Sequence, residues 1–148
     1  MRVTAKGRYA LRAVVNLAKN GNGKPVSIKK ISGEEEISAE FLEQICFRLK
    51  KAGIIRSVRG PGGGFLLARK PQAISMYDIF EAVGEGALVA SCAPYSDGDA
   101  VKNCHRRHKC FVHPTWNKLS QEVVRLLQSY TIKTIMQDTA NSSTSAGL

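Results

Sequence analysis

Apolar residues near the start of the chain recur at the spacing of one helix face. They are Ala10, Ala13, Val14 and Leu17, which follow the i, i+3, i+4, i+7 pattern of a helix that faces a core. The pattern predicts a helix over about residues 6–19.

Two shorter helices are predicted next, each after a serine whose side chain can accept a hydrogen bond from the first turn. Ser27 precedes a helix over about residues 28–34, and Ser38 precedes a helix over about residues 39–52. Residues 33–37 are predicted to form the turn between them. Two short helices joined by a tight turn are the helix-turn-helix pattern.

A β-hairpin is predicted after the second of these helices. Residues 54–59 and 65–68 have the composition of strands, and residues 60–64 (Gly-Pro-Gly-Gly-Gly) form a turn between them. A hairpin with a slim glycine-rich tip is a plausible wing. The predicted fold class is mainly α with a small β-hairpin, a winged helix-turn-helix followed by a long C-terminal helix.

The second half of the chain combines helices with a long irregular segment. Helices are predicted over residues 75–83 and over about residues 116–130, and no regular pattern is present over residues 84–115. An irregular segment of that length is uncommon unless it is functional or binds a metal. Residues 139–148 are small and polar, which predicts a disordered tail.

The long helix carries apolar residues spaced three or four apart. Paired helices meet along such a stripe, and a helix that packs on its own domain has the same spacing. We call this stripe the seam; it consists of Trp116, Leu119, Val123, Leu126 and Tyr130.

The excess positive charge lies in the first half of the chain. The net charge is +10; the first 70 residues contain 15 lysines and arginines against 5 acidic residues, and residues 71–148 contain 7 of each. This asymmetry suits a partner of dense negative charge, first of all nucleic acid, although a basic surface without a partner has the same composition.

Membrane and enzyme functions have no support in the sequence. It has no run of about 18 apolar residues and no apolar signal core at its start, so we expect a cytosolic protein. No nucleophile–base pair with a supporting third group is recognisable, and the glycine run lies in a hairpin instead of before a helix. We therefore expect no enzymatic activity.

One face of the helix over residues 39–52 is predicted to read DNA. At 100° per residue, the core face contains Leu42, Ile45, Cys46 and Leu49, and the outer face contains Glu40, Glu43, Gln44, Phe47 and Lys51. The Gln44 amide can pair with adenine, and the Glu43 carboxylate can accept a hydrogen bond from the amino group of cytosine.

Cationic side chains nearby are predicted to contact the DNA backbone and the minor groove. Arg59 precedes the hairpin tip, where Gly60 and its neighbours keep the hairpin slim enough for a minor groove, whose negative potential attracts arginine. The predicted phosphate contacts come from Lys6, Arg8, Arg12, Arg48, Lys50 and Lys51. For each of these residues, a solvated helix face is the alternative.

Three of the four cysteines lie in the irregular segment, and a histidine follows them. The spacing is Cys92-x₁₁-Cys104-x₅-Cys110-x₂-His113. Thiolates bind soft metals and iron–sulfur clusters, and mixed cysteine–histidine ligation of clusters occurs. The lack of C-x₂-C pairs makes zinc less suitable without excluding it. Cys46, on the apolar helix face, is expected to be a buried core residue.

The residues around these cysteines suit an anionic group. Lysines and arginines flank Cys104 and Cys110, and cations stabilise thiolates by lowering the pKa of the thiol. His105 and His108 are alternative fourth ligands, each more often a solvated loop residue than a ligand.

Three segments identify a family resemblance. MRVTAKGRYALRAVVNLA, FLEQICFRLKKAGII and SVRGPGGGFLLAR resemble the IscR-type winged-helix transcriptional regulators, a family that includes nitric-oxide-sensing and cysteine-metabolism repressors. The match extends from Met1 to about Val83. Cys104-x₅-Cys110-x₂-His113 resembles the ligand set with which three cysteines and a histidine hold a 2Fe–2S cluster in that family.

The resemblance implies a homodimer joined through the long helix, an operator that is palindromic, and DNA affinity that depends on the cluster. By position, Ser38, Glu43, Gln44 and Arg59 match DNA-contacting residues of the family. The implied organisation is a DNA-binding domain over residues 1–83, a cluster-binding loop over 84–115, a dimerisation helix region over 116–138 and a tail over 139–148.

The resemblance also leaves alternatives open. The polar insert Ala93 to Asn103 makes the Cys92–Cys104 spacing longer than in the family pattern, so a 4Fe–4S cluster with a non-cysteine ligand is an alternative to 2Fe–2S. A cluster-free regulator with thiol switches and an adaptor that uses the winged helix for protein contacts are alternative functions.

Overall fold

Helices make up most of the structure, which is a computed structural model that describes residues 2–87, 89–90, 92 and 104–145, with the side chains of 143–145 left out. The elements in chain order are α1 (Ala5–Asn20), α2 (Ile28–Glu35), α3 (Ala39–Lys51), β1 (Ile55–Val58), β2 (Gly64–Leu67), η1 (Pro71–Ala73), α4 (Met76–Val83), η3 (Arg107–Lys109), α5 (His113–Ser129) and α6 (Ile132–Ser145). This order of elements confirms the predicted fold class, a mainly helical winged helix-turn-helix with a small β-hairpin.

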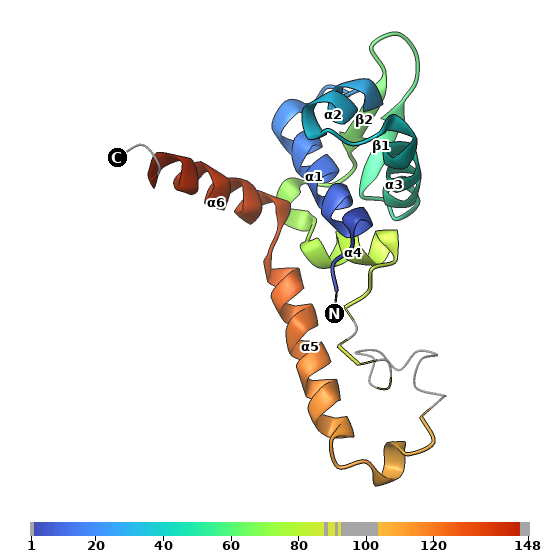
Figure 1. Ribbon diagram of the computed structural model, residues 1–148. Helices are drawn as coiled ribbons and strands as arrows, with labels where there is room; N and C mark the ends of the chain where they lie inside the picture. Colours follow the sequence, from blue (N-terminus) through green and yellow to red (C-terminus); the bar gives the residue numbers. More distant parts are fainter. Residues whose placement is uncertain (1, 88, 91, 93–103, 146–148) are drawn as a thin grey trace.

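Helix α1 lies at the centre of the N-terminal part, against α2, α3 and α4 (Figure 1). Its predicted apolar stripe is buried: Ala10, Ala13 and Val14 are fully enclosed, and Leu17 nearly so. These side chains belong to one core with apolar residues of α3 and α4, among them Phe80. Burial of each large side chain stabilises the fold by about 1.5–3 kcal/mol.

A serine is the N-cap of each of three helices: Ser27 of α2, Ser38 of α3 and Ser75 of α4. The Ser27 hydroxyl accepts from Lys30 N at 3.2 Å, and the Ser38 hydroxyl accepts from Phe41 N at 3.3 Å. Ser75 and Asp78 form a reciprocal capping box at the start of α4. Local hydrogen-bond chemistry therefore fixes where these helices begin.

The turn between α2 and α3 is shorter than predicted. Helix α2 continues through Gly33 to Glu35, and the reversal occurs at Glu36, which has a left-handed conformation with φ 53°. The prediction that the turn begins at Gly33 is wrong: only residues 36–38 separate the two helices, and Ile31 of α2 and Ile37 of the turn are both buried in the core.

The predicted hairpin is present, with Ile55 opposite Leu67 and Val58 opposite Gly64. Its second strand also pairs with Val26, since Val26 N donates to Phe65 O at 2.9 Å and Phe65 N donates to Val26 O at 2.8 Å. A Cβ on Gly64 would collide with the Val26 backbone, so this close approach requires glycine.

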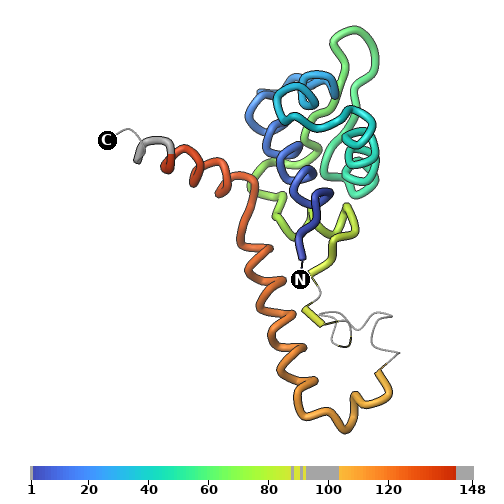
Figure 2. The backbone as a smooth tube through the Cα atoms, in the orientation of Figure 1, coloured from blue at the N-terminus to red at the C-terminus, as the bar shows by residue number. Residues whose placement is uncertain are grey.

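Helix α5 extends away from the N-terminal part (Figure 2), and backbone hydrogen bonds tie the chain just after it to the residues around η1 and α4. Met76 N donates to Tyr130 O at 2.8 Å, and Ile132 N donates to Ile74 O at 2.9 Å. The helix begins at His113, three residues before the predicted start, because Pro114 has no need of an N–H in the first turn and is compatible with a helix there. Within the described residues, no helix is long and apolar enough to cross a membrane.

Helix α6 extends through residues that composition suggests are disordered. The structure shows helix to Ser145, whereas the disordered tail is expected from residue 139; residues 146–148 lie outside the described residues. Burial of Ile132 anchors the helix, and each further residue adds one hydrogen bond to a turn already formed. The hydroxyls of Thr139 and Ser142 bond back to carbonyls four residues earlier.

Candidate nucleic-acid interface and cysteine segment

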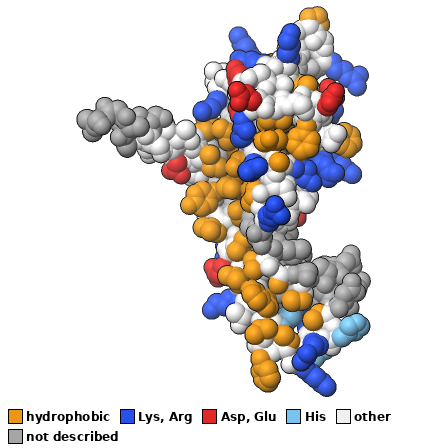
Figure 3. All heavy atoms as spheres, in the orientation of Figure 1, with side chains coloured by type: hydrophobic (Ala, Val, Ile, Leu, Met, Phe, Trp, Pro, Cys, Tyr) orange, Lys and Arg blue, Asp and Glu red, His pale blue; other side chains and the backbone are white. Residues whose placement is uncertain are grey.

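The outer face of α3 is exposed, as the helical angle predicts. Leu42, Ile45, Cys46 and Leu49 are buried, and the predicted DNA-facing residues Glu43, Gln44 and Lys51 are exposed. In Figure 3, lysine and arginine side chains surround the upper part of the molecule, where α1, α2, α3 and the hairpin lie. The face that would meet DNA is therefore open to solvent, and lysine and arginine side chains lie around it.

The two predicted base readers lie together. Glu43 and Gln44 line an open hollow of about 380 Å³ with Phe47 and Arg48. Amide, carboxylate, aromatic and guanidinium groups therefore share one concave patch. The sequence places Phe47 on this face without indicating a role for it.

Cys46 lies directly behind this face, in the core. Burial, together with a smaller effect of the negative charge of Glu43, raises the pKa of its thiol to about 11. At neutral pH the thiol is protonated, which confirms the expectation of a core cysteine and makes it a poor ligand or sensor.

Ser38, Arg59 and Gly60 lie at the two ends of the DNA-facing surface. The Ser38 hydroxyl caps α3, so its side chain already has a hydrogen bond within the chain. Arg59 is exposed just before the hairpin tip, and Gly60 turns the chain with φ 98°. The structure places Arg59 where a projecting hairpin can carry it toward DNA.

Lys6 and Arg8 lie in the first turns of α1, where the structure reveals a contact that the sequence did not suggest. The Glu85 carboxylate accepts from Thr4 N and Gly7 N, each at 3.1 Å, and from the Thr4 hydroxyl. Lys6 lies near the same carboxylate, whereas Arg8 is exposed. A residue just past α4 therefore holds the N-terminus of α1.

Glu85 is ionised over a wider pH range because of this contact. Partial burial raises its pKa, but the hydrogen bonds from Thr4 and Gly7 and the charge of Lys6 outweigh that effect, so the pKa is lower than its usual value of 4.5. Stabilisation from this carboxylate is complete above pH 4.5 and is lost as the pH falls through the lowered pKa.

Replacing Glu85 by glutamine is expected to lower the free energy of unfolding by about 1 kcal/mol at neutral pH, since hydrogen bonds to a charged acceptor are replaced by weaker ones in a half-exposed site. Urea unfolding of both proteins should show the difference shrinking as the pH falls below 4.5. Glu81→Gln, on the exposed side of α4, is the matched control. A difference that stays constant down to the acid limit would refute the role given to the Glu85 charge.

The cysteine segment supplies soft donors and one buried imidazole. Cys92, Cys104 and Cys110 are half-buried, and η3 lies between the last two. His113 opens α5 with only 7% of its surface exposed, and its Nε2 has no hydrogen-bond partner among the residues that the structure describes. A buried nitrogen without a partner costs about 1–3 kcal/mol, which a bound group could offset.

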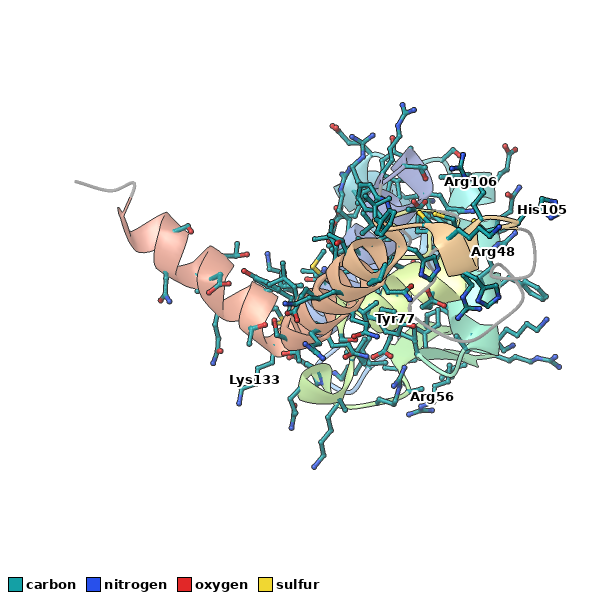
Figure 4. All side chains as sticks on the ribbon, turned by 90° about the horizontal axis from the view of Figure 1, so that it is seen from below. Arg48, Arg56, Tyr77, His105, Arg106 and Lys133 are labelled. Atoms are coloured by element: carbon teal, nitrogen blue, oxygen red, sulfur yellow. The ribbon has the colours of Figure 1, made fainter. Side chains whose placement is uncertain are left out.

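The four predicted ligands do not form a ready metal site. Among the described residues, no three histidine, cysteine or acidic side chains are close enough to hold an ion. The insert at residues 93–103 lies outside the described residues. His105 and Arg106 point outward from the segment that leads into α5 (Figure 4). The donor types fit an iron–sulfur cluster, but in the described residues the four side chains do not lie together as one ligand set.

Comparison with known proteins decides the family. The family model described as Rrf2, iron-dependent transcriptional regulator, matches residues 3–138. The chain belongs to the Rrf2 family of transcriptional regulators. A relative, the HTH-type transcriptional regulator IscR of Vibrio cholerae, is 36% identical over 138 residues, which cover 93% of this chain and 76% of that protein.

Solved Rrf2-type structures have the same architecture. IscR of T. potens is similar with a TM-score of 0.69 and 32% identity, over 94% of this chain and 88% of that one. CymR, the global cysteine regulator of B. subtilis, is similar with a TM-score of 0.69 and 27% identity, over 91% and 95%. As members of a family of transcriptional regulators, these proteins support DNA binding by this chain.

The seam of this Rrf2 regulator is largely exposed within one chain. Leu119 and Leu126 are 43% and 58% exposed, and Trp116 and Tyr130 are also exposed. Figure 3 shows hydrophobic side chains gathered along the part of the molecule that α5 forms. The neighbouring face of α5, with Val124 and Leu127, packs into the core, and Val123 of the seam packs partly against the same core. The helix therefore has one apolar face inside the protomer and a second one on its surface.

Proposed function

We propose that this Rrf2 regulator binds a palindromic operator as a homodimer in the cytoplasm and senses iron–sulfur cluster status, nitric oxide or redox state. The observation that carries the proposal is the family match together with three cysteines and a buried His113 whose Nε2 has no partner in the described part of the chain. In this proposal the winged helix binds the operator (the output), and the cysteine segment detects the signal (the input).

The proposed ligands are Cys92, Cys104, Cys110 and His113, with 2Fe–2S favoured over 4Fe–4S. When bound, the cluster would supply an electron-accepting group whose presence or oxidation state can change. The cationic run Arg106, Arg107 and Lys109 offsets the negative charge that three thiolates bring. The burial of His113 would limit access of water to one side of the site.

Glu85 offers a physical route from the input to the output. Glu85 lies at the start of the segment that contains Cys92, and its carboxylate holds Thr4 and Gly7 at the start of α1. Helix α1 in turn packs against α3. A change in the cysteine segment can therefore alter the support of the DNA-reading helix.

The proposed dimer forms through the seam. Its residues follow the spacing of paired helices, and a second copy is the natural partner for an apolar stripe of this kind, since a two-fold axis places identical stripes against each other. Two copies would present two α3 helices and two hairpins, as a palindromic operator requires.

A cluster-free regulator with thiol switches is the second candidate. The similarity to CymR, whose printed description names cysteine, favours it. Three half-exposed thiols in a basic setting are suitable for oxidation. The two candidates share the DNA-binding half and differ only in what the cysteines hold.

Anaerobic purification separates these candidates. A brown protein that contains iron and sulfide supports the cluster, and a colourless protein with three titratable thiols in the segment supports the switch.

Binding to a palindromic operator, measured over a range of salt concentrations, tests the proposed DNA-binding function. Affinity that falls steeply with salt is expected from phosphate contacts, and an affinity insensitive to salt would contradict DNA docking.

Replacing Arg59 by alanine is expected to weaken operator binding by about tenfold, on the order of 1.4 kcal/mol, through loss of the minor-groove cation. Fluorescence anisotropy with a labelled operator measures the change. Arg56→Ala is the control, since Arg56 points outward from β1 of the same hairpin and removes the same charge away from the tip (Figure 4). Equal losses of affinity in both variants would show that Arg59 contributes only general positive charge and no contact with the minor groove.

A further inference from the structure

Phe47 is a large aromatic side chain left in solvent at the centre of the DNA-facing surface. It is 70% exposed, although its helix neighbours Cys46 and Leu49 are buried. At 100° per residue, Gln44, Phe47 and Lys51 are successive members of one line that runs directly opposite the core. The phenyl ring therefore offers apolar surface that a partner could bury with a gain in free energy.

The surroundings of Phe47 identify that partner. Its ring helps to line the hollow of about 380 Å³ that Glu43 and Gln44 share, and a second hollow of about 450 Å³ that includes Arg48 and Lys51. An apolar protein partner would have to bury both cations. A DNA duplex instead accepts cations on its phosphates while the ring between them meets the base edges.

We propose that Phe47 contacts the C5-methyl group of a thymine in the major groove and is a specificity-determining residue of this regulator. The thymine methyl is an apolar group on the major-groove edge, and phenylalanine is one of the side chains that can contact it. Gln44 and Glu43, on the same hollow, read the polar edges of neighbouring bases. The inference rests on the proposed DNA-binding function and adds a base preference to it.

The test begins with the full-length protein and a random pool of duplex DNA. After selection of a preferred duplex, each thymine is replaced singly by uracil, which removes only the methyl group. At one thymine in each half-site, uracil should weaken wild-type binding about fourfold, the ~0.8 kcal/mol of one methyl group converted at 1.4 kcal/mol per factor of ten.

Phe47→Ala should bind the thymine duplex at least fourfold more weakly and should bind the thymine and uracil duplexes equally. Phe47→Leu should retain part of the discrimination, because leucine keeps apolar surface at the same place. If Phe47→Ala binds no DNA, the uracil scan with wild type and Phe47→Leu still tests whether this side chain contacts the thymine methyl group.

A wild type that selects a sequence but is insensitive to uracil at every position overturns this inference alone. The same is true if Phe47→Ala still discriminates thymine from uracil. A wild type that enriches no duplex sequence overturns the proposed function as well, so the two failures are distinguishable.

Discussion

Replacing Leu119 and Leu126 together by glutamate is expected to convert the regulator from a dimer to a monomer. Both side chains are exposed within one chain, so the monomer should fold normally. In a two-fold interface each substitution occurs twice, which places four carboxylates in an apolar contact without partners. Sedimentation or light scattering at micromolar concentration measures the change in mass.

The same variant should lose operator affinity by a factor on the order of 100 or more, because each half-site is then bound without help from the other. Gln121→Glu together with Gln128→Glu is the matched control. These exposed residues lie on the opposite side of α5 from the seam and add the same charge. A seam variant that stays dimeric, or a control that dissociates equally, would contradict dimerisation through this stripe.

Elements whose signals are local could be predicted from the sequence. Ser27, Ser38 and Ser75 mark helix starts because an N-cap hydrogen bond joins residues only three positions apart. The inner and outer faces of α3 follow from helical geometry alone. The hairpin follows from its glycines, since few other residues tolerate the turn at Gly60 and Gly62.

Features that depend on distant contacts could not be predicted. Glu85 lies about 80 positions from Thr4 and Gly7, and no periodicity connects them. The start of α6 depends on Ile132, which is buried and whose N–H donates to the carbonyl of Ile74, a residue distant in the sequence. Composition alone therefore underestimates how far that helix extends.

For the cysteine segment, the sequence predicts the chemistry of the ligands but not their positions relative to one another. The sequence names three thiols and an imidazole, and their residue types are enough to suggest a soft metal centre. The burial of His113 adds a physical reason to prefer it to His105 and His108, which are exposed. Where the four donors lie relative to one another depends on the fold of a long segment, and no local pattern specifies it.

Cys104→Ala is expected to remove the visible absorption of anaerobically purified protein almost completely, with iron and sulfide falling to trace levels. A cluster held by three thiolates loses one of its main ligands, and Cys46 cannot replace it, because its thiol is buried and has a pKa of about 11. Absorption, Mössbauer spectra and iron content per chain measure the effect. Cys46→Ala is the matched control, since it removes a thiol from the core and should leave the spectrum unchanged.

His113→Ala separates the fourth ligand from the thiolates. Loss of the imidazole should alter the spectrum and shift the reduction potential, because both depend on which groups ligate the irons. His108→Ala removes an exposed imidazole from the same segment and should change neither. If His108→Ala alters the spectrum and His113→Ala does not, His113 is not the ligand. If the absorption of Cys104→Ala survives, the cluster is held by other residues, and the sensing function proposed for this segment fails.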